Sequence, residues 1–386
     1  MLPLADFLSR YPDTRLATAA DNARLLELFD TAPMQTSSFD VRYHRSPDFF
    51  RLLAHQAERS FVIVTETAAG ALAGVATLSL RPGWMNGQPT TIGALGDLRV
   101  KLHRAAVPRW RRVFADLLTH APAIEELADC TQWFTAVLDD NRRGRRSLEA
   151  RGDDAPRLVP LAPFTMRNLV ARLPLPRARH RPAHLRIRRA QPSDREALAA
   201  FFESENRGLA LGFRGELDRR LARWEGLSIE AFVYAADAQG IVACVAPWSP
   251  SPVKQTVVSR VPTALRWLGA FTSRLPGPRV RIPRAGEPLR MPYLTHLTFA
   301  ARLDDRARAS VFRALLDRLF DEWTDADWHC VALCDFDAWR LGRVLRDFVQ
   351  QTVPITVYAV LPPGGSPDAL AAMRGGGPPA FEMAMV

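Results

Sequence analysis

Two titratable side chains stand within segments that are otherwise typical of β-strands. Asp97 lies near the end of GALGDLRV (93–100), and His296 lies within MPYLTHLTFA (291–300). A carboxylate or an imidazole can accept a proton from a reacting group, and a carboxylate can also hold a cation. The alternatives are a salt-bridged aspartate at a strand end and a histidine satisfied within the core.

The chain lacks several common catalytic motifs. It contains no HExxH, GxSxG or GxGxxG motif and no P-loop lysine motif, which argues against zinc peptidases, serine hydrolases, dinucleotide-binding enzymes and P-loop kinases. Cys330 and Cys334, with His329 nearby, could suggest a metal site. Residues four positions apart on a strand lie about 13 Å apart, however, which is too far to share one ion. We therefore expect core cysteines and no metal.

The elements that must position Asp97 and His296 occur twice along the chain. A repeat of about 170–200 residues is too long for a solenoid, whose units run to about 20–50 residues, so we expect two homologous domains. Within the second match, Val75 aligns with Val245. The matched segments are 15–29 with 187–202, 61–78 with 232–248, 110–118 with 308–316, and 132–141 with 327–337.

Periodicity predicts the same order of elements in both copies, a mixed sheet with helices packed on it, of the α/β (α+β mixed sheet) class. Asp21 and Ser46 are the expected caps of the first two helices. In the first copy we expect strands at 15–18, 61–67, 71–80, 90–100, 132–138, 158–163 and 166–171, and helices at 21–30, 47–56, 107–118 and 141–150. In the second copy we expect strands at 185–189, 231–236, 241–248, 292–300, 328–335 and 353–361, and helices at 194–203, 216–224, 305–323 and 339–348.

This pattern gives an N-terminal domain (1–172), a proline-rich linker (173–184), a C-terminal domain (185–361) and a mobile Gly/Pro-rich tail (362–386). Between the third and fourth strands the first copy has about ten residues (81–90). The second copy has about forty (249–290).

The longer insertion, 249–290, contains VPTALRWLGAFTSRL (261–275), whose apolar residues recur at helical spacing around Trp267. This helix could cover a ligand site, contact an apolar part of a ligand or touch a membrane surface. The alternative is packing between domains or protomers, and the sequence leaves a homodimer open.

Charge and composition bound the partners and the compartment. The formal net charge is +10, and of 51 basic residues only Lys101 and Lys254 are lysines. The arginines either form a solvated surface or attract phosphates of a nucleotide or an RNA. No apolar run reaches the ~18 residues that span a bilayer, the first residues make a poor signal peptide, and four scattered cysteines suggest no disulfide framework. We therefore expect a cytoplasmic protein.

The order of elements, found twice, resembles the Gcn5-related N-acetyltransferase (GNAT) fold over residues 15–172 and 185–361. The segment GALGDLRVKLHRAAVPRWRRVFADLL (93–118) carries the resemblance most directly: GDLRV is similar to the end of the family's fourth strand, and VFADLL is similar to the helix that follows. The resemblance implies two GNAT-like acyl-CoA N-acyltransferase domains in tandem. It also implies an acyl-coenzyme A (acyl-CoA) site in a splay between the fourth and fifth strands.

The resemblance implies roles for residues of the first copy. The backbone at Leu98 and Val100 would pair with the pantetheine arm, and Asn141 would contact the cofactor or cap the next helix. The family's glycine-rich pyrophosphate loop is missing, and Pro108 removes one backbone donor. Side-chain phosphate ligands would then replace the glycines, unless they are surface residues: Arg109, Arg111 and Arg112.

The function implied is transfer of an acyl group from acetyl-CoA or a longer acyl-CoA to a small-molecule or peptide amine, with Asp97 or His296 as the base. Two alternatives stay open. An aminoacyl-tRNA-dependent transferase of similar tandem fold would suit the arginine content, although no basic patch interleaved with aromatic residues supports RNA binding. A non-catalytic protein that senses acyl-CoA or acts as a scaffold would suit the lost glycines.

Overall fold

The computed structural model describes most of the chain. Three expectations lie outside the described residues: the inserted helix at 261–275, nearly all of the helix at 141–150 and most of the linker at 173–184. The described residues are 1–30, 34–35, 40–101, 106–141, 155–173, 184–260, 281–323, 327–365, 370, 373 and 377–386.

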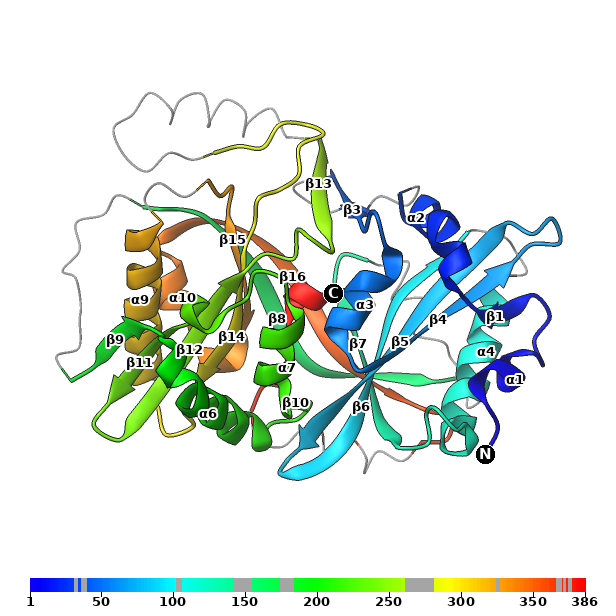
Figure 1. The fold of residues 1–386 in the computed structure, drawn as a ribbon, viewed down its shortest axis with the longest axis horizontal. Coiled ribbons are helices and arrows are strands. Elements are labelled where there is room, and N and C mark those ends of the chain that lie inside the picture. Colours follow the sequence, from blue (N-terminus) through cyan, green and yellow to red (C-terminus); the bar gives the residue numbers. More distant parts are fainter. Residues whose placement is uncertain are drawn as a thin grey trace.

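Within these residues, thirteen strands form one mixed sheet that runs through both repeats, with helices on its two faces (Figure 1). The path is β1-β4-β5-β6-β7-β16-β8-β15-β14-β12-β11-β9, and β10 pairs with β5. The strands are β1 (Thr14–Leu16), β4 (Arg59–Glu66), β5 (Leu72–Met85), β6 (Gln88–Val100), β7 (Cys130–Leu138), β8 (Arg157–Arg172), β9 (Arg186–Arg189), β10 (Gly212–Phe213), β11 (Val233–Asp237), β12 (Gly240–Trp248), β14 (Tyr293–Phe299), β15 (Val331–Phe336) and β16 (Phe348–Leu361).

Helices flank this sheet in the predicted order, so the α/β class with a mixed sheet is confirmed. They are α1 (Leu4–Leu8), α2 (Asn22–Asp30), α3 (Phe49–Gln56), α4 (Ala106–His120), α6 (Arg195–Arg207), α7 (Glu216–Arg223), α9 (Asp305–Glu322) and α10 (Gly342–Leu345). Strands β6 and β7 are parallel, as are β14 and β15, whereas the other neighbours along the path are antiparallel.

The two repeats exchange their last strands. Strand β16 of the second repeat lies between β7 and β8 of the first, and β8 in turn pairs with β15 of the second. The β8–β16 ladder runs from Phe348↔Arg172 to Leu361↔Arg157. Neither repeat therefore completes its sheet without the other.

Alternation along β4 explains how the first repeat buries both faces of its sheet. Val62 and Val64 pack against α2 and α3, whereas Ile63 packs against α4 on the opposite face. The helix residues that complete these cores are Leu25, Phe29, Phe49 and Leu53 on one face and Trp110, Val113 and Leu117 on the other.

Each repeat also extends an arm to the other. The 81–90 segment, expected as a loop, instead lengthens the β5–β6 hairpin around a tight turn at Asn86 and Gly87, both of which have positive φ. The arm pairs with β10, and the buried Arg81 donates to the Leu211 and Gly212 carbonyls. In return, β13 (Gln255–Arg260) of the insertion pairs with β3 (Asp40–His44), which also pairs with β2 (Met34–Gln35).

Some expected boundaries are wrong for identifiable reasons. Segments 158–163 and 166–171 form one strand, β8, despite Pro160 and Pro163. Strand β15 pairs only with residues 164–169 of β8, so both prolines lie where β8 has an open edge, which tolerates a missing N–H. The helix expected at 339–348 shrinks to α10 because Arg340 is left-handed and β16 already begins at Phe348.

Two local details also differ from expectation. The cap of α3 is Asp48, whose carboxylate accepts from the Phe50 amide, and not Ser46. Register with the next strand places Val75 opposite Arg99 and Cys244 opposite Thr298, so Val75 corresponds to Cys244, one residue before the expected Val245.

The tail expected to be mobile is partly ordered. Residues 380–386 enter the protein between the two halves (Figure 1), where Met383, Ala384 and Met385 are buried. The Ala380 amide donates to the Ala210 carbonyl at 2.9 Å. Apolar side chains within the Gly/Pro-rich composition explain this packing.

The close packing of Gly212 in β10 against the end of α6 predicts a steric test. A Cβ on Gly212 would lie 2.1 Å from the Asn206 carbonyl oxygen, so Gly212→Ala should lower the free energy of unfolding by about 1–3 kcal/mol. Gly208 has no neighbouring atom within 4 Å of its added Cβ, so Gly208→Ala should change it by less than about 0.5 kcal/mol. Urea unfolding measures both; equal stability of the two variants would contradict the contact.

Candidate functional site

The fourth strand of each repeat contains the same backbone irregularity. Asp97 in β6 and His296 in β14 both have φ near 55°, and at each the ladder with the preceding strand shifts so that two residues face one. The two candidate bases thus occupy equivalent positions. A non-glycine residue held in this region costs about 1–3 kcal/mol, and such residues cluster at functional sites.

Parallel neighbours separate close to these bulges. Strand β6 pairs with β7 only from Thr91 to Ala94, and further on the Thr135 hydroxyl donates to the Leu95 carbonyl at 2.9 Å. Strand β14 pairs with β15 only at Tyr293. Each repeat therefore has an opening between its fourth and fifth strands, which we call the first opening (β6/β7) and the second opening (β14/β15).

The second opening is occupied by the chain's own residues 380–386. At its bulge the His296 amide donates to Glu382 Oε1 at 2.7 Å, and Arg220 donates to the same oxygen at 3.2 Å. Burial raises the pKa of Glu382, while Arg220 and the amide favour its charged form. An amide at this bulge can therefore hold a carboxylate oxygen.

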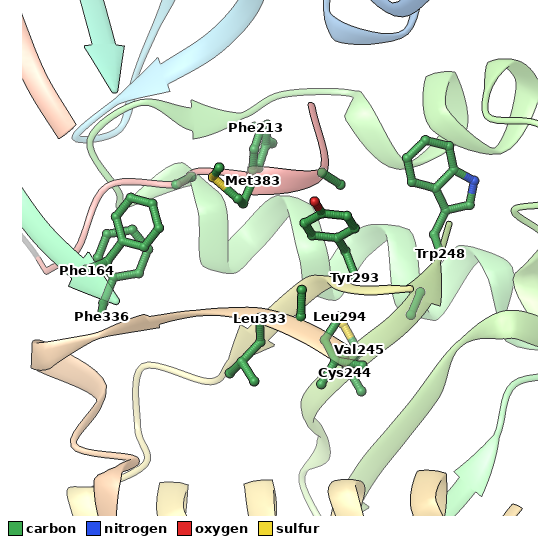
Figure 2. Close-up of a cluster of buried hydrophobic side chains, with 14 of the residues drawn as sticks. Phe164, Phe213, Cys244, Val245, Trp248, Tyr293, Leu294, Leu333, Phe336 and Met383 are labelled. Atoms are coloured by element: carbon green, nitrogen blue, oxygen red, sulfur yellow. The ribbon is translucent and has the colours of Figure 1, made fainter. Parts of the chain in front are cut away.

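Apolar residues complete this closure. Phe381 packs against Phe134 and Phe164, with ring centroids 6.4 and 5.2 Å apart. Figure 2 shows Met383 on the same side of the sheet as Phe213 and Tyr293. The segment 380–386 thus lies over the second opening and reaches toward the first repeat.

His296 is held on every side. The ring is 1% exposed, and Phe202, Trp224 and Phe232 surround it. Burial, together with the Arg220 charge, holds the pKa of His296 well below its usual range.

Both ring nitrogens of His296 are already committed. Arg220 Nη1 donates to Nε2 at 3.2 Å, which places the proton on Nδ1, and Nδ1 donates to Thr295 Oγ1 at 2.9 Å. The Thr295 hydroxyl then donates to the Ala246 carbonyl at 2.8 Å. No lone pair of the ring is left for a substrate proton.

The first opening has different surroundings. The Asp97 carboxylate accepts two hydrogen bonds from the buried Arg45, at 2.6 and 2.8 Å, and one from Thr77 at 3.2 Å. The Arg45 guanidinium lies 4.9 Å from the ring centroids of both Phe29 and Phe49. Asp97 therefore already holds a cation, supplied by its own chain.

Leu98, next to this bulge, is 39% exposed, which is unusual for a large apolar side chain here. Among the described residues, the other large hydrophobic side chains exposed to this degree are Met1, Val349 and Val386. Val100, at the end of β6, instead packs partly against the α4 core. A single exposed leucine is common on a protein surface, but at an open splay it is also a position that a ligand could cover.

A buried lysine lies near the Asp97–Arg45 pair. Lys254 is 4% exposed, and its Nζ is 5.6 Å from the ring centroids of Tyr43 and Tyr293 and contacts the Val386 carbonyl. Burial, helped by the Arg45 charge and opposed by Asp97, lowers the pKa of Lys254 to about 7.

The three arginines predicted to bind phosphate lie on α4. Arg109 pairs with Asp13 at 3.2 Å, Arg111 is exposed, and Arg112 is 81% exposed with Asp116 at 3.8 Å. Arg109 and Arg112 face a cavity of about 630 Å³ between α1 and α4. Its lining is Phe7, Arg10, Tyr11, Pro12, Arg109, Arg112, Asp116 and His120.

This cavity and the Asp97–Arg45 pair lie on opposite faces of the sheet, because α4 covers one face and α2 and α3 cover the other. Asn141 is exposed directly after β7, and its amide donates to the Leu138 carbonyl at 3.0 Å. The predicted cofactor residues therefore line the far side and the end of the first opening and do not form one cluster.

Three residues of the site gave no usable signal in the sequence. Arg45 lies in a loop without a motif, Glu382 lies in a tail expected to be mobile, and Lys254 opens the insertion. The rarity of lysine in this chain was the one available hint for Lys254.

Among the described residues, no three His, Cys, Asp or Glu side chains gather as metal ligands. Likewise, none of the helices in that part of the chain combines the length and apolar character needed to cross a membrane.

Lys254 predicts a pH-dependent stability. In the unfolded chain Lys254 stays protonated up to about pH 10.5, whereas in the folded chain it stays protonated only up to about pH 7. The lysine therefore destabilises the fold most at and below pH 7 and least above about pH 10.5. Lys254→Met should therefore stabilise by about 1–3 kcal/mol at pH 7, with the gain shrinking toward pH 10. Denaturant unfolding at several pH values measures this. A gain independent of pH, as expected for the exposed Lys101→Met control, would contradict the assignment.

No protein-family model and no curated protein sequence matches this chain. Several solved structures with TM-scores above 0.5 are similar to it, among them the following two. Saccharomyces cerevisiae N-myristoyltransferase with bound myristoyl-CoA has a TM-score of 0.54 at 12% identity over 92% of this chain and 86% of that chain. The GCN5-related glucosamine N-acetyltransferase region of a fungal multi-domain GH3 β-N-acetylglucosaminidase has a TM-score of 0.58 at 14% identity over 90% of this chain and 38% of that chain.

At these identities the likeness establishes the fold alone. Three observations indicate the same fold: the paired openings between fourth and fifth strands, the duplicated order of elements and the two similar structures. The chain is a protein of the Gcn5-related N-acetyltransferase fold, present as two copies in tandem.

Proposed function

We propose that the first repeat binds an acyl-CoA and transfers its acyl group to an amine. One observation carries the proposal: the second opening is filled by residues 380–386, whereas the first has an exposed Leu98 at its bulge and no described segment laid across it. N-myristoyltransferase, which is similar over most of this chain, binds myristoyl-CoA. Its likeness supports an acyl-CoA substrate in general.

The bulge supplies the electrostatic part of the reaction. Because Asp97 and His296 share φ and register, the Asp97 amide should point into its opening as the His296 amide does toward Glu382. There it would donate to the thioester carbonyl oxygen and stabilise the negative charge that develops as the amine attacks. The carbon–sulfur bond then breaks, and the leaving thiolate takes up the proton lost from the nitrogen.

Other residues take supporting roles in this proposal. The backbone from Leu98 to Val100 would pair with the pantetheine arm, and Asn141 lies where the opening ends. Arginines on the first turns of α4 would meet the phosphates, aided by the positive end of the helix dipole. These are Arg109, Arg111 and Arg112.

The two candidate bases acquire different roles. Asp97 holds Arg45 and so fixes the bulge, and His296 is a structural residue of the closed repeat. Acetyl-CoA or a longer acyl-CoA is the donor, and a small-molecule or peptide amine is the acceptor. Cytoplasmic localisation and a homodimer remain predictions, and no feature of the described residues favours the tRNA or scaffold alternatives.

Calorimetric titration with acetyl-, octanoyl- and palmitoyl-CoA, beside free coenzyme A, tests the proposal. We expect about one molecule bound per chain. Leu98→Glu should weaken binding at least tenfold because it places a carboxylate beside the bulge, whereas Val349→Glu, at a similarly exposed apolar residue on β16, should leave affinity unchanged. Two molecules per chain, no binding, or equal loss in both variants would contradict the assignment.

A further inference from the structure

The insertion of the second repeat delivers a lysine to the first. After β12 the chain leaves the large sheet, and Lys254 immediately precedes β13, which pairs with β3 through Gln255↔His44 and Thr256↔Tyr43 (Figure 1). Strand β3 precedes Arg45, the partner of the Asp97 bulge. Lys254 therefore lies beside the residue that holds the Asp97 bulge, on the side of α2 and α3.

The contacts of Lys254 Nζ are with aromatic rings and with one main-chain oxygen. Two tyrosine rings and the Val386 carbonyl surround the Nζ atom, and no ion pair with an acidic side chain is seen for it among the described residues. A permanently charged surface lysine would be strongly hydrated or paired. Instead, burial brings the pKa to about 7, so a large fraction of the amine is neutral near neutral pH and carries the lone pair of a nucleophile.

We propose that Lys254 is itself acylated by the acyl-CoA bound in the first opening. The inference rests on the proposed function, because it needs that substrate with its carbonyl at the Asp97 bulge. Arg45 and Asp97 both act electrostatically on Lys254, which places the amine within the field of the bulge's own ion pair. The geometry is that of an internal acceptor: an amine carried by one repeat and presented to the acyl site of the other.

The step balances without a further reactant. The neutral Nζ attacks the thioester carbonyl carbon, a nitrogen–carbon bond forms and the carbon–sulfur bond breaks. The coenzyme A thiolate leaves and takes the proton released by the nitrogen. The products are an N-acyl-lysine at 254 and free coenzyme A.

Acylation would also change the local packing. It removes the positive charge that lies between Tyr43 and Tyr293 and adds an acyl group to a buried site. The contact with Val386 and the packing of residues 380–386 would have to adjust.

The test uses the full-length protein with acetyl-CoA and octanoyl-CoA at pH 8, read by intact mass and peptide mapping. We expect one added acyl group per chain, located on Lys254. Lys254→Arg should lose the modification and Lys101→Arg should keep it; because the chain has only these two lysines, the site is unambiguous. A thioether analogue of acetyl-CoA should bind without modifying the chain.

The pH dependence provides a second readout. The groups that face Lys254 are Tyr43, Tyr293, Arg45 and Asp97. With a pKa of about 7, the neutral fraction, and with it the rate of acylation, should rise roughly tenfold between pH 6 and pH 8.

The outcomes separate the two proposals. Acyl-CoA that binds but leaves Lys254 unmodified overturns this inference and leaves the proposed function standing. Modification that falls on Lys101, or that is equal in urea-unfolded protein, also overturns it, because it would be ordinary chemical acylation. If the thioether analogue does not bind either, the proposed function fails as well.

Discussion

A single left-handed residue in the fourth strand of each repeat sets the geometry on which the rest of the molecule depends. At Asp97 and at His296 the chain holds a φ that only glycine adopts without strain, and near this bulge the fourth and fifth strands cease to pair. The strain persists because each bulge is fixed by charged groups. Arg45 grips the Asp97 side chain, whereas Glu382 and Arg220 surround His296. The two repeats thus carry equivalent bulges. One opening is covered by residues 380–386, and the other is not covered by any described segment.

The exchanged strands connect the surroundings of the two openings. Because β16 completes the first repeat's sheet and then leads to residues 380–386, the segment that closes the second opening starts from the first repeat. The same segment ends at Lys254, which the insertion carries over to β3. One end of the chain therefore contacts the His296 bulge through Glu382 and the insertion through Val386, and the acyl site that we propose would have an acceptor side built from both repeats.

Much of this was predictable, and the limits have physical causes. Period-two and helical patterns located most elements. Matched apolar positions, such as Val113 with Val311 and Leu117 with Leu315, are equally buried, so the duplication could be predicted from the sequence. Strand exchange was not, because β8 and β16 look alike to any local pattern and their partners are set by long-range pairing. Asp97 and His296 were found through their residue type, but their equivalence depends on a bulge that one residue of register decides. Arg45 meets Asp97, and Glu382 meets His296, only through tertiary packing, so no spacing along the chain could group them. The same is true of Lys254 and Val386.

Hydrogen–deuterium exchange of the full chain, with and without a saturating thioether analogue of acetyl-CoA that cannot acylate Lys254, tests the central claim that one opening binds and the other is closed. The account predicts slower exchange of the amides in 95–100 and 134–138, with no change in 293–299, 331–336 or 380–386. Protection of the second opening on addition of the analogue, or faster exchange of 380–386, would show that the second repeat opens to bind the ligand and would contradict the account.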